Sequence, residues 1–158
     1  MNIEKRNKIL TVVLGVIIIG LTYWLYDSLV TPYQTVVKRQ QMTERVHNRM
    51  MSVKDALIQF ETRTDSFPPT QGGLDTLVQF LKTDSLMMAM GDSLLGYGFD
   101  NGFNPDSIIY SPRPPHNKFI YTLNDTLRPQ LYLLEDPDTE DAIGHLERTT
   151  MRNAPNWN

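Results

Sequence analysis

The sequence contains no cysteine among its 158 residues, and it holds only three histidines. Without cysteine the chain has no disulfide, no cysteine nucleophile and no lipid-modified cysteine. The histidines (His47, His116 and His145) are too far apart in the sequence for the ligand spacing of a metal site. Cations are few and the formal net charge is −3, so we expect no nucleic-acid partner.

Charge is missing from one long stretch near the N-terminus. Residues 9–26 read ILTVVLGVIIIGLTYWLY and contain no acidic or basic residue. As a helix this stretch would extend about 27 Å, close to the ~30 Å of a bilayer core. It is longer than the apolar region of a typical signal peptide, and no small-residue cleavage site follows it. We therefore expect an uncleaved transmembrane anchor over residues 9–30.

The basic residues around this anchor predict its orientation. A cationic cluster precedes it, whereas the next cations, Lys38 and Arg39, come well after its end. The positive-inside rule then places residues 1–8 in the cytoplasm and the C-terminal head in the periplasm, with the anchor in a bacterial inner membrane. The expected interface residues are Lys5, Arg6 and Lys8 on the cytoplasmic side and Tyr23, Trp24 and Tyr26 on the outer side.

A long helix is expected to follow the anchor, over residues 31–63. No glycine or proline occurs between Tyr33 and Arg63, while Pro32 could start or kink the helix. Apolar residues then recur at spacings of four and three, which is typical of an amphipathic helix that packs on a core. This stripe consists of Val46, Met50, Val53, Leu57 and Phe60. A homodimeric coiled coil along the same stripe is the alternative.

Residues 64–146 are expected to form a small α+β head. Phe67-Pro68-Pro69 ends the long helix, a short helix covers residues 74–81, and Asp84 caps another that Gly91 ends. Three short strands are predicted, of which the last two form a hairpin: Ser107–Ser111, Lys118–Leu123 and Gln130–Leu134. The predicted fold is thus α+β, with a transmembrane helix continuing into a long amphipathic helix packed on a small antiparallel sheet. Residues 147–158 are expected to be a polar tail, frayed from Met151 onward.

Charge is distributed unevenly between the long helix and the head. Residues 34–63 carry six basic and three acidic residues, a net +3, whereas residues 64–158 carry six basic and thirteen acidic residues, a net −7. Opposite charges on two parts of one chain predict attraction between copies, or toward a partner subunit. Two unrelated solvated surfaces are the alternative.

One tetrapeptide matches the signature of a hydrolase family. Residues 91–94 spell Gly-Asp-Ser-Leu, in which the serine would be the nucleophile of an acyl-transfer reaction. The histidine base of that family lies in Asp-x-x-His, but Asp141 and His145 are separated by one residue too many. We therefore expect no enzymatic activity and no small-molecule substrate, with a membrane-anchored serine hydrolase kept as an alternative.

A dense group of carboxylates follows the last predicted strand. Oxygen-rich loops of this kind bind calcium in many proteins, although the spacing here is not that of an EF-hand. No other cofactor is expected, and a solvated acidic loop is the alternative. The candidate calcium ligands are Glu135, Asp136, Asp138 and Asp141.

Two neighbouring segments carry a resemblance to a known family. Residues 53–60 (VKDALIQF) and 67–77 (FPPTQGGLDTL) resemble the major pseudopilins of type II secretion systems, in which a long helix ends near a Tyr-Pro-Thr segment. The resemblance covers residues 45–135 and implies a long helix packed on a small antiparallel sheet. The chain departs from the family at its N-terminus, where Gly15 is not followed by the glutamate of a prepilin peptidase site. The family's glycine-rich calcium loop is also missing.

Together these features predict a non-enzymatic, single-pass inner-membrane protein with a periplasmic, pilin-like head. The head is expected to serve as an accessory or scaffold subunit of an envelope secretion, motor or transport complex. Its expected partners are the lipid bilayer and other membrane or periplasmic subunits, including copies of itself. The alternative is a filament component of a type II secretion-like system.

Overall fold

The computed structural model describes residues 3–157, which fall into two compact units that divide between Gln41 and Met42. One helix, α1 (Ile3–Thr64), contributes to both units and contains Pro32 in its interior. The structure therefore has one continuous helix where the sequence predicts an apolar segment that continues into a long amphipathic helix.

The first unit consists of the N-terminal part of α1 alone. Most of its apolar side chains between Ile9 and Val36 are exposed, because a single helix offers little to bury them against. None of its most apolar stretch is buried, and the helix is long and apolar enough to cross a bilayer.

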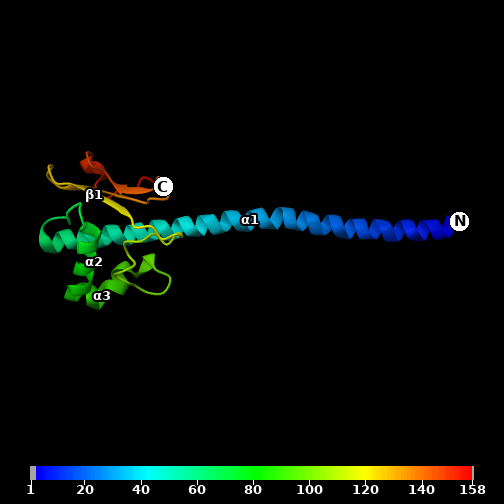
Figure 1. The fold of residues 1–158 in the computed structure, drawn as a ribbon, viewed down its shortest axis with the longest axis horizontal. Coiled ribbons are helices and arrows are strands. Elements are labelled where there is room, and N and C mark those ends of the chain that lie inside the picture. The colour runs from blue at the N-terminus through cyan, green and yellow to red at the C-terminus, as the bar shows by residue number, and fades with distance from the viewer. Residues whose placement is uncertain (1–2, 158) are drawn as a thin grey trace. The chain divides into compact units, whose positions relative to one another are not determined.

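The second unit is an α+β head built on the C-terminal part of α1. The chain continues through α2 (Gly73–Thr83), α3 (Ser85–Leu95), β1 (Ile120–Asn124), β2 (Leu131–Glu135) and β3 (Ala142–Gly144), with short 3-10 turns at Gly96–Gly98 and Thr149–Met151. The strands form an antiparallel sheet in the order β1-β2-β3. The sheet lies on one side of α1, and α2 and α3 lie on the other (Figure 1).

The head core is formed between these layers. All five residues of the predicted stripe on α1 are buried, with at most 9% of any of them exposed. The sheet contributes Tyr121, Tyr132, Leu134 and Ile143, and α2 contributes Leu74, Leu77 and Leu81. Burial of a large apolar side chain contributes roughly 1.5–3 kcal/mol, so this contact between layers is what holds the head together.

The two short helices form where the sequence predicts them, but the second ends later than predicted. As predicted, Asp84 caps α3, because its carboxylate accepts hydrogen bonds from the backbone of Leu86 at 2.9 Å and Met87 at 3.1 Å. The predicted end at Gly91 is wrong, since α3 continues to Leu95. A Cβ atom at Gly91 would lie 2.8 Å from the ring of Phe103, so this glycine permits close packing and does not end the helix.

The sheet contains the predicted hairpin but not the predicted first strand. β1 and β2 pair in antiparallel fashion, from Ile120 opposite Glu135 to Asn124 opposite Leu131. Residues 107–109 lie in a turn, and an isolated antiparallel bridge joins Tyr110 to Lys118. Ile108 and Ile109 are buried all the same, so their apolar character reflects burial in the core, which a loop can also supply.

The C-terminal segment is ordered against the sheet, which corrects the expectation of a frayed tail. The backbone N–H of Gly144 donates to the Ala154 carbonyl at 3.0 Å, and that of Asn156 donates to the Ala142 carbonyl at 2.9 Å. The outer edge of β3 is thereby covered, as an exposed strand edge in a folded protein usually is.

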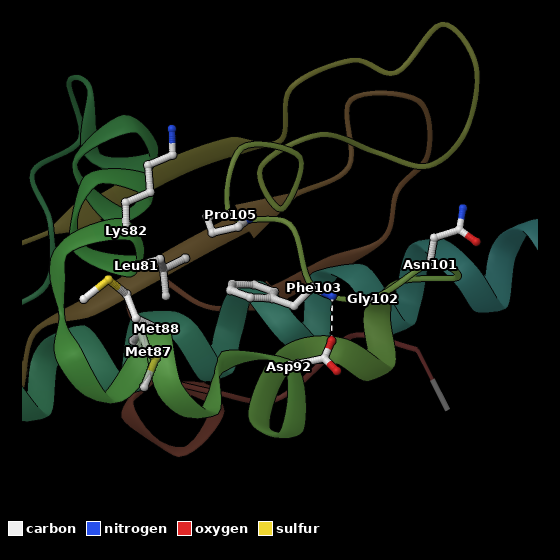
Figure 2. A pocket seen from close by; sticks show the side chains of 9 residues that line it. All are labelled: Leu81, Lys82, Met87, Met88, Asp92, Asn101, Gly102, Phe103 and Pro105. Carbon is white, nitrogen blue, oxygen red and sulfur yellow. Dashed lines mark hydrogen bonds between the residues drawn. The ribbon is translucent and has the colours of Figure 1, made fainter.

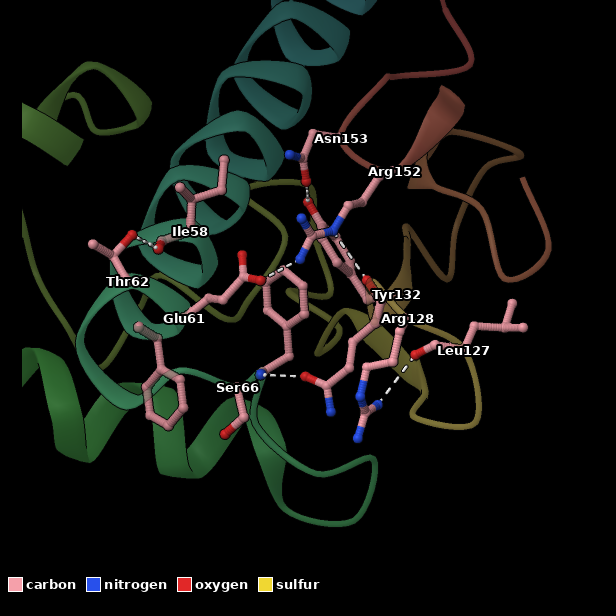
Figure 3. Close-up of polar contacts among 12 residues, drawn as sticks. Ile58, Glu61, Thr62, Ser66, Leu127, Arg128, Tyr132, Arg152 and Asn153 are labelled. Atoms are coloured by element: carbon pink, nitrogen blue, oxygen red, sulfur yellow. Dashed lines mark hydrogen bonds and ion pairs between the residues drawn. The ribbon is translucent and has the colours of Figure 1, made fainter. Parts of the chain in front are cut away.

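One arginine ties this segment to the rest of the head (Figure 3). The guanidinium of Arg152 forms an ion pair with Glu61 of α1 and donates to the Gln130 carbonyl at 3.0 Å. It also lies over the ring of Phe67, 5.0 Å from the ring centre. Beside it, the Tyr132 hydroxyl donates to Asn153 Oδ1 at 3.0 Å.

Candidate interaction sites

The expected membrane-interface residues all lie on the N-terminal part of α1. The three cations Lys5, Arg6 and Lys8 are exposed within its first two turns. The aromatic residues Tyr23, Trp24 and Tyr26 are each at least 65% exposed. In water such apolar exposure is unfavourable, whereas at a lipid surface it is stabilising.

A groove in the head lies between α2, α3 and the loop after α3 (Figure 2). It encloses about 480 Å³, a size within the range of sites that hold small ligands or partner side chains. Its apolar wall consists of Leu81, Met87, Met88, Phe103 and Pro105, and its polar lining residues are Lys82, Asp92, Asn101 and Gly102.

Two polar residues fix the shape of this groove. Asp92 Oδ1 accepts a hydrogen bond from the Phe103 backbone at 2.7 Å, which holds the loop against α3. Lys82 Nζ lies 2.5 Å from the carboxylate of Asp106 at the rim. Because the loop is held at both places, the groove is a built feature of the head.

The methionines of α3 divide between the core and this surface. Met87 is buried, whereas Met88 is 65% and Met90 is 46% exposed. Methionine side chains are flexible and polarisable, so an exposed group of them adapts well to an apolar partner. The groove beside Met88 is therefore a candidate contact surface for another protein.

A second groove of about 470 Å³ lies where α1 meets the C-terminal segment. The rings of His47 and Trp157 stack there, and His47 Nε2 lies 3.1 Å from Asp141 Oδ2. Nothing in the sequence pattern indicated this contact, because residues 47, 141 and 157 are brought together only by the tertiary fold. The Pro155 and Met51 side chains complete its apolar lining.

Several of the charges counted in the sequence pair within the head. Arg45 lies 3.3 Å from Asp100, and Arg63 lies 3.7 Å from Asp84. Arg49 donates to the Gly98 carbonyl at 2.8 Å and stacks on Phe99, and burial lowers its pKa. Part of the positive charge of residues 34–63 is therefore compensated within the chain, which weakens its attraction for an acidic partner.

The residues expected to assist a Ser93 nucleophile form hydrogen bonds with other groups. Ser93 is exposed inside α3, while the aspartate beside it holds the loop of the groove. Asp141 pairs with His47 and not with His145. His145 Nδ1 instead accepts hydrogen bonds from the backbone of Glu147 and Arg148.

The acidic residues predicted as calcium ligands form hydrogen bonds with separate partners. Glu135 is the last residue of β2, and Asp138 accepts a hydrogen bond from Asn117 at 2.8 Å. Asp141 Oδ2 accepts from Thr139 at 3.0 Å. Within residues 3–157 no group of three or more acidic or histidine side chains is arranged to hold a metal ion. Calcium binding at residues 135–141 therefore stays a prediction.

Asp136 is the buried member of this acidic group. Its Oδ2 accepts a hydrogen bond from Thr139 at 2.9 Å and lies 4.0 Å from Arg113. Its Oδ1 is buried and has no hydrogen-bond partner among residues 3–157. A nearby guanidinium offsets part of the cost of burying this carboxylate, so Asp136 has a structural role in the turn between β2 and β3.

Comparisons with known proteins identify no relative of this chain. No family model matches the sequence, and neither a curated protein nor a solved structure is significantly similar to it.

Proposed function

We propose that this chain is a single-pass protein of a bacterial inner membrane whose periplasmic head is an accessory or scaffold subunit of an envelope secretion, motor or transport complex. The observation that carries the proposal is the fully exposed apolar stretch of α1. A helix with this composition is stable in a bilayer, where its side chains meet lipid and its backbone is internally hydrogen-bonded.

The composition of the flanks supports the proposed orientation. Three cations precede the apolar stretch and three aromatic residues lie toward its other end. This arrangement favours a cytoplasmic N-terminus and a periplasmic head.

The head is proposed to act by binding and without catalysis. Its surface offers a groove with exposed methionine beside it, which suits an apolar contact with another protein. We also propose that the head is pilin-like, on the basis of its long helix, its antiparallel sheet and the resembling segments at residues 53–60 and 67–77. The missing peptidase site favours a permanent anchor over a processed filament subunit.

The absence of cysteine makes the topology directly testable. The variants Asn7→Cys and Ser93→Cys each place a single thiol at an exposed position, one on either side of the apolar stretch. In spheroplasts we expect a membrane-impermeant maleimide to label Ser93→Cys at once and Asn7→Cys only after permeabilisation. The unchanged chain is the unlabelled control. Release of the protein by alkaline carbonate would overturn the anchor, and the reverse labelling pattern would overturn the orientation.

The role as a complex subunit is tested by affinity purification of the full chain in mild detergent, followed by mass spectrometry. We expect a defined set of membrane or periplasmic proteins, lost from Met88→Asp but kept in Ser93→Asp. The second variant adds the same charge to α3 away from the groove. Recovery of the protein alone would contradict the proposal, and cleavage of the N-terminus by a prepilin peptidase would favour the filament alternative.

A further inference from the structure

A second apolar stripe occurs on α1, beginning at the C-terminal end of the proposed anchor and continuing beyond it. Leu29 is 64%, Tyr33 is 71% and Val36 is 53% exposed. These residues follow one another at spacings of four and three, as residues of one helix face do. Exposed apolar residues scattered singly are ordinary, but a regular row along a helix indicates a surface that is covered by a partner.

The stripe has the pattern of a coiled-coil seam. From Tyr26 the spacings are three, four, three and four, which assigns positions a, d, a, d and a to Tyr26, Leu29, Tyr33, Val36 and Gln40. Val30 and Val37 then occupy the e positions and widen the apolar face. The one polar residue, Gln40, falls at an a position, where such a residue fixes the register of two helices.

The charges beside the seam favour a second copy of the same chain. In parallel two-stranded coiled coils, a g residue of one helix faces the e residue five positions later on the other. In this register Arg39 is at g and Glu44 is at e, and both are exposed. Two identical parallel chains therefore bring Arg39 of each next to Glu44 of the other, which gives two attractive pairs.

The membrane makes this pairing favourable despite its short length. A seam of two heptads is marginal in water, since short isolated helices gain little on pairing. Chains anchored in one bilayer are already parallel, at the same height and confined to a surface, which raises their effective concentration. The inference thus rests on the proposed membrane anchor, because only that anchor fixes the parallel orientation.

We propose that the protein forms a parallel homodimer through residues 26–40 of α1, with Leu29, Tyr33 and Val36 at the contact. Each pair of heads is thereby carried on one two-stranded stalk. The complex subunit proposed above then presents two copies of its groove to its partners.

The test uses single cysteines in the full chain in native membranes. Leu29→Cys, Tyr33→Cys and Val36→Cys lie on the seam, whereas Gln34→Cys and Lys38→Cys lie at b and f positions. Mild oxidation is expected to give disulfide-linked dimers from the first three and monomers from the last two. Equal cross-linking at all five positions would show random collision and would overturn the seam.

The charge pair gives a second, independent measurement. In the Tyr33→Cys background, Arg39→Glu should lower the yield of cross-linked dimer about twofold to fivefold through repulsion from Glu44 of the other copy. Adding Glu44→Arg should restore that yield. A yield that stays low in the combined variant, or cross-links to a different protein only, would overturn the homodimer.

Failure of the dimer and failure of the anchor give different results. If the chain stays in the carbonate-resistant membrane fraction but no seam position cross-links, the dimer is wrong and the anchor stands. If the chain is released into the soluble fraction, the proposed anchor is wrong. The dimer proposal then fails as well, because only the anchor fixes the parallel orientation.

Discussion

The indole ring of Trp157 stacks on the imidazole of His47, with ring centres 4.0 Å apart and planes 13° from parallel. The contact joins the C-terminal segment to the part of α1 that lies within the head. It explains why the C-terminal segment is ordered although its composition is polar. The carboxylate of Asp141 holds the other edge of the same imidazole.

Replacement of this ring is expected to loosen the C-terminal segment. Trp157→Ala removes a half-buried aromatic contact and should lower the free energy of unfolding by about 1–2 kcal/mol. Chemical denaturation of the full chain in detergent measures this loss, and carboxypeptidase digestion should release the C-terminus faster. Trp157→Phe keeps a stacked ring and is the control. Unchanged digestion of the alanine variant would show that the stack does not hold the segment.

Arg152 is expected to contribute more to stability than an ordinary surface arginine. Its side chain is 23% exposed, and its guanidinium contacts Glu61, the Gln130 carbonyl and the ring of Phe67. Arg152→Ala removes the donor to the Glu61 carboxylate and to the Gln130 carbonyl, so we expect a loss of about 2–3 kcal/mol. Arg148→Ala, at an exposed position, should change stability by less than about 0.5 kcal/mol. Equal effects of the two substitutions would contradict a special role for Arg152.

Gly98 is required by close packing against α1. A Cβ atom at this position would overlap Ser52 Oγ and lie 3.0 Å from the Asn48 carbonyl. Ser52 cannot turn away without losing its hydrogen bond to Leu95 at 2.9 Å. Gly98→Ala should therefore destabilise the head by roughly 1–3 kcal/mol in thermal denaturation. A Cβ atom at Gly20 has no neighbour within 4 Å among the described residues, so Gly20→Ala should leave the same transition unchanged.

Two buried tyrosines predict how stability responds to alkaline pH. Burial raises the pKa of Tyr121 and of Tyr132 above the ordinary value of about 10. Above that pH the unfolded chain releases these protons while the folded chain retains them, so unfolding becomes more favourable as pH rises. The stabilisation is present in full below pH ~10 and is lost above it. Denaturation midpoints across this range should fall together with the appearance of tyrosinate absorbance, and a flat profile would contradict the burial.

Periodicity and local turn chemistry were sufficient to predict part of the fold. The stripe on α1, the Asp84 cap and the hairpin each depend on neighbouring residues, which a sequence displays directly. The apolar pair Ile108 and Ile109 misled the strand prediction, because a buried loop needs the same residues as a strand.

The remaining errors concern contacts between distant parts of the chain. β3 has only three residues, and its pairing depends on β2 and on the C-terminal segment. The stack of Trp157 on His47 likewise has no local signal. Such contacts are defined by the tertiary fold, so neither the ordered tail nor the second groove could be predicted from spacing.

The Gly-Asp-Ser-Leu tetrapeptide gives a direct test of the non-enzymatic proposal. A serine nucleophile needs a histidine base within hydrogen-bond reach, itself oriented by a carboxylate. Asp141 already pairs with His47, and His145 Nδ1 accepts hydrogen bonds from its own turn. Ser93 in α3 therefore has neither an oriented base nor a strained turn to activate its hydroxyl, and we expect no reaction with a fluorophosphonate probe.

The control for this probe is a matched pair of variants in the same helix. Ser93→Ala and Ser85→Ala both remove an exposed hydroxyl from α3 without touching its cap. If the unchanged chain were labelled, and labelling were lost in Ser93→Ala but kept in Ser85→Ala, the serine hydrolase alternative would replace the scaffold proposal. Because the groove is held by Asp92, Asp92→Asn serves as a further check, since it alters the Phe103 loop without removing the hydroxyl. Absence of labelling in all of these chains, beside a labelled hydrolase standard, is the result that a purely binding head requires.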